Sequence, residues 1–324
     1  MISVTEKIRF IESVLGRAQV YAKNIDVKCP FCDDSKKKRL SIRLADDICH
    51  CWVCGFSSRT ILPLVVKFGT RDQVHEYKTR FIPELPDAKK ISVVNTDEAR
   101  KIRLPSDFKL LALARDSKDP ETRMMIRYCE QRGLSDREFW HWRLGFSNQG
   151  AMRRRVIVPS FDASGEVNYY AARTIDPPPY FYGKYKNADA DKNEIIFNEL
   201  NIDWTQKLVI VEGPFDLMKC RMNATCLLGS SFSTKSRLFQ KVLEHETPVV
   251  MMLDDEMQGK VQEIGRLLTS YNVSVYNTKF VSEHDPGEMT FDRVAEYVEK
   301  ATPWSWATLL SHKIAKATSC SLRL

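Results

Sequence analysis

From residue 208 to residue 216 the chain reads LVIVEGPFD. Four consecutive aliphatic residues are typical of a strand that is buried on both faces, as in a parallel sheet. Glu212 follows that strand directly, and Gly213 permits a sharp turn into a helix that carries Asp216. An acid at the carboxyl end of a parallel strand lies where open α/β sheets bind ligands. The stretch therefore predicts an acidic site at one edge of an α/β domain.

A second acidic stretch repeats this arrangement. Residues 248–253 form another buried-strand pattern, and Asp254 and Glu256 follow it on either side of a third acid. Asp285 and Glu288 add carboxylates beyond the next predicted strand. Such a cluster repels itself unless cations bind, so Mg²⁺ or Mn²⁺ is implied. The alternative is a set of unrelated surface acids near helix N-termini, but the placement at strand ends favours one shared site.

Two CxxC pairs lie near the N-terminus, Cys29 with Cys32 and Cys51 with Cys54. Each pair offers two thiolates to one ion, and this spacing is typical of a structural zinc ribbon. Cys49 and His50 are alternative ligands, although only Cys51 makes the second pair symmetrical. Trp52 either packs under the ribbon or stays exposed to stack an unpaired base.

The composition excludes some classes of protein. Hydrophobic residues make up 43% and charged residues 28% of the 324 residues, which is ordinary for a globular protein with packed cores. No run of 18 apolar residues occurs, so neither a membrane span nor a signal peptide is expected, and the predicted compartment is a cytoplasm. The formal net charge of +7 is compatible with a polyanionic partner. Basic clusters at residues 36–39 and 153–155 are either solvated surface or nucleic-acid contacts.

The order of these motifs resembles the DNA primases of bacteria and their phages. A zinc ribbon, an EGxxD strand end and a D-x-E pair follow one another in that family as they do here, and T-even-like phage primases also carry four ribbon cysteines. The resemblance implies a Toprim domain in which acids bind the catalytic divalent metal ions. Those acids match Glu212, Asp216, Asp254, Glu256 and Asp285, of which Glu212, Asp254 and Glu256 would be catalytic.

The resemblance also extends to basic residues of the middle domain. An arginine before a strand that runs into a proline matches Arg155, and an arginine near the end of the following strand matches Arg173. A Lys-Tyr-x-Asn string matches Lys184 and Asn187. In the family such residues face the incoming nucleotide and the template, so the resemblance implies the same roles here.

The resemblance implies a fold class and five segments. We expect a multidomain α+β and α/β protein with an N-terminal zinc ribbon, a mixed α/β middle domain and a Toprim domain with a mainly parallel sheet. The expected segments are 1–68 (zinc-ribbon DNA-binding domain), 69–105 (linker), 106–203 (N-terminal part of an RNA polymerase domain), 204–285 (Toprim catalytic domain) and 286–324 (C-terminal helical tail).

The implied activity is template-directed synthesis of short RNA primers on single-stranded DNA from ribonucleoside triphosphates. One structural Zn²⁺ and catalytic Mg²⁺ or Mn²⁺ are the implied cofactors. No GxxxxGK[ST] motif occurs, so a replicative helicase would be a separate chain, met in a bacterial or phage-infected cell. Residues 296–324 either dock on that helicase or cover the Toprim sheet.

Two other classes of protein contain a Toprim domain and are alternatives to a primase. A type IA topoisomerase has a Toprim site but needs a tyrosine nucleophile and a larger scaffold than 324 residues provide. A non-catalytic zinc-plus-Toprim clamp of the recombination-mediator type would bind DNA without incorporating nucleotides, and it would not need Arg155, Arg173 and Lys184 in the primase order.

Overall fold

The computed structural model of the chain divides into two compact units. The first unit comprises Met1–Thr96, Phe232–Thr247 and Leu267–Val273, and the second comprises the remaining segments. The described residues are 3–32, 38–81, 101–180, 183–229, 232–254, 257–278, 286–305 and 307. Two predicted acids, Glu256 and Asp285, lie outside the described residues, as do Lys36 and Lys37.

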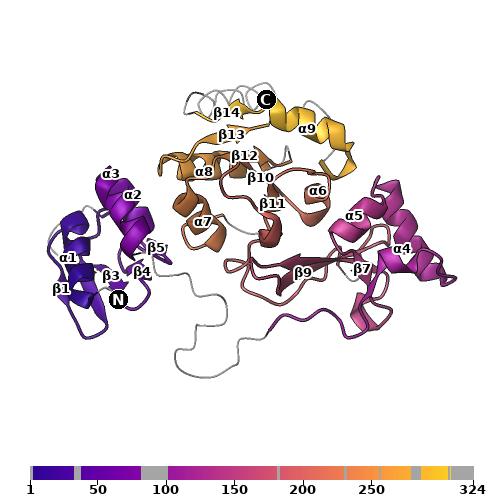
Figure 1. The fold of residues 1–324 in the computed structure, drawn as a ribbon, viewed down its shortest axis with the longest axis horizontal. Coiled ribbons are helices and arrows are strands. Elements are labelled where there is room, and N and C mark those ends of the chain that lie inside the picture. Colours follow the sequence, from indigo (N-terminus) through magenta and orange to yellow (C-terminus); the bar gives the residue numbers. More distant parts are fainter. Residues whose placement is uncertain are drawn as a thin grey trace, which may run out of the picture. The chain divides into compact units, whose positions relative to one another are not determined.

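The first unit contains an antiparallel sheet of five short strands that pair in sequence order (Figure 1). The strands are β1 (Gln19–Val20), β2 (Asn24–Val27), β3 (Leu40–Arg43), β4 (Cys49–Cys51) and β5 (Ser57–Ser58). The helices are α1 (Val4–Leu15), α2 (Leu62–Phe68), α3 (Arg71–Glu76), the π-helix η1 (Tyr77–Phe81) and α7 (Arg237–His245). Buried and accessible residues alternate along β2 and β3, so the sheet has one core face.

The first unit extends further along the chain than the sequence predicts. Tyr77 is fully buried, and its ring stacks on Phe10 with centroids 5.8 Å apart. Phe81 also stacks on Phe10, at 4.7 Å. Residues 71–81 are therefore helical and packed, although the predicted linker begins at residue 69. The part of that linker from 82 to 100 lies outside the described residues.

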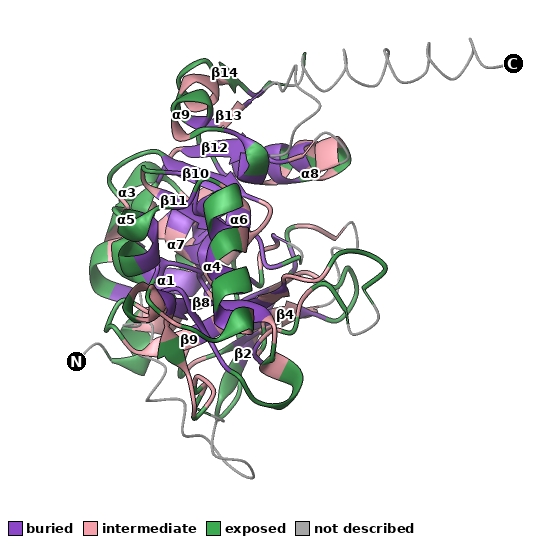
Figure 2. Cartoon of the chain, turned by 90° about the vertical axis from the view of Figure 1, so that its right-hand side faces the viewer, coloured by how far each residue is buried: buried purple, intermediate pink, exposed green. Residues whose placement is uncertain are grey.

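The second unit contains a five-stranded sheet in the order β11-β10-β12-β13-β14. Its strands are β10 (Leu208–Val211), β11 (Ala224–Cys226), β12 (Val249–Met252), β13 (Val275–Asn277) and β14 (Thr302–Pro303). The first four pair in parallel, and β14 pairs antiparallel with β13. Every residue of β10 and β12 is buried, as expected for the centre of a covered parallel sheet (Figure 2). The predicted mixed α/β fold class with a mainly parallel sheet is confirmed.

A second, antiparallel sheet in this unit has the order β6-β7-β8-β9. Its strands are β6 (Lys109–Leu110), β7 (Gly145–Phe146), β8 (Arg155–Phe161) and β9 (Val167–Thr174). The helices of the unit are α4 (Pro120–Gln131), α5 (Asp136–His141), α6 (Pro214–Leu217), α8 (Gln258–Thr269, in this unit as far as Arg266) and α9 (Phe291–Glu299), with 3₁₀ turns η2 (Leu111–Ala114), η3 (Gly150–Met152), η4 (Glu199–Asn201) and η6 (Pro286–Glu288). Side chains from both sheets pack together in one buried hydrophobic core.

The segment after η6 completes the five-stranded sheet. Helix α9 contributes Val294 to the core, and β14 adds the edge strand. Trp304 is buried, and its indole N–H donates to the Gln262 Oε1 atom at 2.8 Å. The predicted helical tail, residues 286–324, is thus a helix followed by a strand as far as it is described; residues 308–324 lie outside the described part. No helix among the described residues is long and apolar enough to cross a membrane.

Candidate functional site

Four cysteines of the first unit converge on one point. The Sγ atoms of Cys29, Cys32, Cys51 and Cys54 all lie within 4.8 Å of one another. Cys29 and Cys32 belong to a turn after β2, in which the Cys32 N–H donates to the Cys29 carbonyl at 3.2 Å. Four thiolates around one point match the ligand set of tetrahedral structural zinc. The site therefore fits one Zn²⁺ ion.

The two alternative ligands lie elsewhere. Cys49 is fully buried, and its thiol donates to the carbonyl of Thr60 at 3.7 Å. Burial raises the pKa of Cys49 to about 12, so this thiol stays neutral. The His50 ring contacts the edge of Trp52 at a centroid distance of 4.5 Å, away from the cysteine set. Cys51 thus completes the set, as the symmetrical pairing predicts.

In the second unit, the ends of adjacent parallel strands bring distant acids together. Val211, the last residue of β10, pairs with Cys226 at the end of β11 and with Met252 at the end of β12. Glu212 follows β10 directly, and Asp254 comes two residues after the end of β12. Because neighbouring strands end in register, both carboxylates reach the same edge of the sheet.

A cavity of about 260 Å³ lies at this edge. Six of the residues predicted from the sequence line it: Arg173, Lys184, Asn187, Glu212, Asp216 and Asp254. Lys192, Leu227 and Leu228 also line it, and no motif of the sequence singles them out. The two leucines have a positional signal, since they follow β11 as Glu212 follows β10. Lys192 has no such signal because it lies in a long loop.

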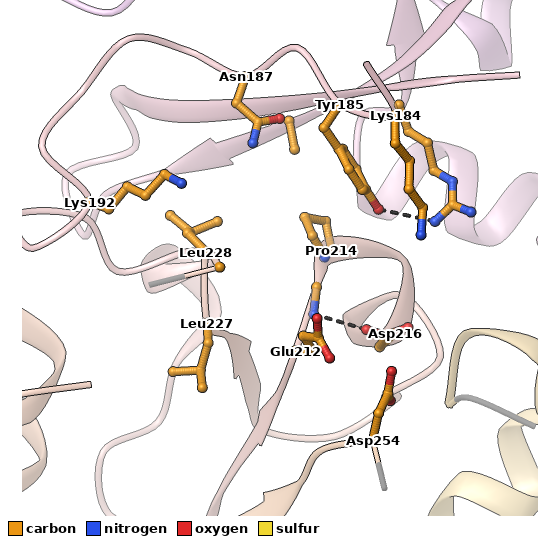
Figure 3. Close-up of a pocket in the computed structure, with 14 residues that line it drawn as sticks. Lys184, Tyr185, Asn187, Lys192, Glu212, Pro214, Asp216, Leu227, Leu228 and Asp254 are labelled. Carbon is orange, nitrogen blue, oxygen red and sulfur yellow. Dashed lines mark hydrogen bonds between the residues drawn. The ribbon is translucent and has the colours of Figure 1, made fainter. Parts of the chain in front are cut away.

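The three acids of the cavity suit a hydrated divalent cation. Figure 3 shows the carboxylates of Glu212, Asp216 and Asp254 directed toward a common region. Asp216 Oδ2 accepts a hydrogen bond from the Gly213 N–H at 2.9 Å. Among the described residues, only the cysteine set has three or more ligand atoms within 4.8 Å of one another, so these acids are more widely spaced. Mg²⁺ prefers oxygen ligands and keeps several waters, so such a donor set fits it.

Arg173 brings a fixed positive charge to the cavity. Its guanidinium lies over the rings of Tyr185 and Phe215, at 5.6 and 5.0 Å from their centroids. Its Nη1 atom donates to the Tyr185 hydroxyl at 3.1 Å. Burial raises the pKa of Tyr185 to about 12, so that hydroxyl stays protonated. Aromatic faces stabilise the cation without neutralising it, which leaves its charge available to an anionic ligand.

The three consecutive arginines 153–155 are all engaged within the protein. Arg153 forms a bidentate pair with Glu121, and Arg154 pairs with Asp176 at 2.5 Å. Arg155 is 4% exposed and does not line the cavity. All three arginines therefore have hydrogen-bonding partners within the protein. The proposed role of Arg155 in binding nucleotide or template stays a prediction.

Arg155 instead joins three pieces of backbone near the cavity. Its guanidinium donates to the carbonyls of Ala151 at 3.1 Å, Ala172 at 3.3 Å and Gly183 at 3.0 Å, and it reaches the carbonyl of Lys184 at 3.4 Å. Ala172 precedes Arg173 in β9, so Arg155 supports the backbone beside two of the cationic side chains of the cavity, Arg173 and Lys184.

We expect Arg155→Gln to lower the free energy of unfolding by about 1–3 kcal/mol, because it leaves buried carbonyl acceptors without their donor. Denaturant unfolding of the whole chain measures this change. Arg153→Gln is the matched control and should change little, since the Arg153 side chain is exposed. If Arg155→Gln left the unfolding midpoint unchanged and weakened only nucleotide binding, Arg155 would contact the ligand directly.

Solved structures that are similar to this chain include bacterial primases of the DnaG type. One is the Aquifex aeolicus primase with its zinc-binding and RNA polymerase domains, 18% identical, covering 94% of this chain and 87% of that one, with a TM-score of 0.47. Another is the RNA polymerase domain of Mycobacterium tuberculosis DnaG, 15% identical, covering 60% of this chain and 81% of that one, with a TM-score of 0.49. The E. coli primase catalytic core is 18% identical and covers 57% of this chain and 75% of that one, with a TM-score of 0.46. No protein-family model and no curated protein sequence matches the chain.

Proposed function

We propose that this chain is a DNA primase, which synthesises short RNA primers on single-stranded DNA from ribonucleoside triphosphates. The observation that supports it is that Glu212 and Asp254 line the same cavity as Arg173 and Lys184. Nucleotidyl transfer needs acids that hold divalent cations beside the reacting phosphate and cations that bind the triphosphate. The cavity supplies the acids from the ends of β10 and β12, and the cations from β9 and the loop that follows it.

The mechanism assigns different tasks to the two sides of the cavity. Glu212 and Asp254, with Asp216 beside them, would hold Mg²⁺ or Mn²⁺, and Glu256 and Asp285 are proposed as further ligands. The bound metal would lower the pKa of the attacking 3′-hydroxyl and neutralise charge on the departing pyrophosphate. Arg173 and Lys184 would bind the phosphates of the nucleotide, with Asn187 as a neutral hydrogen-bonding group. The protein thus contributes placement and fixed charge.

The zinc ribbon is proposed to hold the template. Trp52 is 75% exposed, so it does not pack under the ribbon. The backbones of Trp52 and Arg39 are adjacent, because the Trp52 N–H donates a hydrogen bond to the Arg39 carbonyl at 3.1 Å. An exposed aromatic face beside basic residues is typical of surfaces that stack unpaired bases and contact phosphates.

A replicative helicase is proposed as a partner of the chain. Residues 296–324 are the region that the sequence offers for such docking. As far as it is described, this region contributes the end of α9 and the strand β14 to the second unit. The proposed site of action is the cytoplasm of a bacterial or phage-infected cell.

The function is tested by incubating the full chain with mixed-sequence single-stranded DNA, Mg²⁺ and labelled ribonucleotides, with a helicase from the same source added in a parallel reaction. We expect short RNA whose composition follows the template and whose synthesis stops with chelator. Tight binding of the DNA without incorporation in either reaction would instead support the non-catalytic zinc-plus-Toprim clamp.

A further inference from the structure

Lys192 is a cationic residue of the cavity to which neither the motifs nor the proposed chemistry gives a task. It is half-buried and lines the cavity together with the acids. In Figure 3 its side chain enters from the side opposite to Lys184 and lies near Leu228. The cavity therefore has two separate positive ends. Lys184 lies at one, next to Tyr185, to whose hydroxyl Arg173 donates, and Lys192 lies at the other.

A local turn fixes the backbone of Lys192. The Asp191 carboxylate accepts hydrogen bonds from the backbone N–H of Asn193 at 2.9 Å and from its side-chain amide at 3.1 Å. The Glu194 N–H donates to the Asp191 carbonyl at 2.9 Å and closes the turn. Such Asx turns hold the residue after the aspartate in place. Ile196 and Phe197, fully or almost fully buried, then anchor the loop to the core.

The ammonium group of Lys192 has no carboxylate partner in the part of the chain that the structure describes. By contrast, Arg153, Arg154 and Arg115 of the same unit each pair with a carboxylate. A half-buried ammonium group loses part of its hydration, so an anion from outside the chain would stabilise it.

The anion at this end differs from the nucleotide triphosphate, on the proposed function. A triphosphate held near Glu212 and Asp254 is already met by Arg173 and Lys184. At the other end of the cavity Lys192 lies near Leu228, and Leu227 lines the same cavity. A charged donor over an apolar wall suits a sugar–phosphate backbone, whose phosphate needs a cation and whose sugar face is less polar.

We propose that Lys192 binds a backbone phosphate of the nucleic-acid strand held in the cavity, while Arg173 and Lys184 bind the incoming nucleotide. This inference rests on the proposed function for the identity of the second ligand. The two positive ends of the cavity would thus bind two different ligands. One substitution at each end can therefore distinguish the binding of the nucleic-acid strand from the binding of the nucleotide.

The test compares Lys192→Gln, Lys184→Gln and the matched control Lys186→Gln, an exposed lysine of the same loop that does not line the cavity. Two affinities are measured by fluorescence anisotropy without turnover. One is that for a labelled RNA primer annealed to a DNA template, over a range of salt concentrations. The other is that for a labelled ribonucleoside triphosphate with Mg²⁺.

For Lys192→Gln we expect weaker binding of the primer–template and a plot of log K against log salt that is less steep by about 1, the loss of one phosphate contact. Its nucleotide affinity should equal that of the wild type. Lys184→Gln should weaken nucleotide binding, and Lys186→Gln should change neither affinity. An unchanged salt slope for Lys192→Gln, or a loss of nucleotide affinity alone, would overturn the proposal. Absence of primer synthesis by the wild type would contradict the proposed function but not alter this binding test.

Discussion

Glu212→Gln is expected to reduce primer synthesis by at least ~100-fold, since removal of a single group that stabilises charge in a transition state costs about 10²–10³-fold. The amide keeps the size of the side chain and removes its negative charge, so it weakens the hold on a divalent cation. Glu212 follows a fully buried strand but is itself only half-buried, so the fold should be retained. Incorporation of labelled ribonucleotides under saturating template and nucleotide measures the effect.

Glu299→Gln is the matched control, because Glu299 is exposed at the end of α9 and does not line the cavity. It should synthesise primers at the wild-type rate. Binding of single-stranded DNA by Glu212→Gln should stay close to that of the wild type, which separates loss of chemistry from loss of structure. Undiminished synthesis by Glu212→Gln would remove this residue from the metal site and leave Asp254 and Asp216 as its ligands.

The acidic site is the part of the second unit that the sequence predicts best. Its signal is local: a run of buried aliphatic residues is followed at once by Glu212, and another by Asp254. Parallel pairing then brings both strand ends to one edge, with Val211 opposite Met252. The family resemblance also predicts Arg173, as an arginine near the end of the strand that follows β8. Glu256 and Asp285 lie outside the described residues, so their place in the site stays a prediction.

Long polar side chains are harder to place, because their partners are distant in the sequence. The arginine triplet looks like a nucleic-acid patch, but Arg153 pairs with Glu121 and Arg154 with Asp176, contacts that depend on how β8 packs beside α4 and the end of β9. Arg155 does not line the cavity and is instead hydrogen-bonded to backbone carbonyls. Lys192 could not be found either, since only the tertiary fold brings its loop to the cavity.

Segment boundaries also depend on tertiary packing. The region after residue 69 is polar and reads as linker, but the burial of Tyr77 and Phe81 against Phe10 keeps it in the first unit. At the other end, Thr302 and Pro303 carry no strong strand pattern. They form an edge strand because β13 offers an unpaired side and Trp304 packs beside α8.

Removal of zinc is expected to unfold the ribbon, here defined as β2 to β5 with the four cysteines. Its strands are two to four residues long, and a sheet this small buries little apolar surface. Structural zinc supplies about 10–16 kcal/mol of apparent binding free energy in comparable sites, more than such a core can replace. Treatment with a strong chelator should therefore release one equivalent of zinc and make the ribbon sensitive to proteolysis.

Two serine variants sharpen this prediction, because they differ only in whether the cysteine belongs to the set. Cys54→Ser removes a ligand and should lower the zinc content and expose the ribbon to protease. Cys49→Ser removes a buried thiol that donates to the Thr60 carbonyl, a bond that a serine hydroxyl can also make, so it should keep one zinc. Loss of zinc from Cys49→Ser but not from Cys54→Ser would mean that Cys49 is the ligand. The ribbon would then hold its ion through a different arrangement of β4.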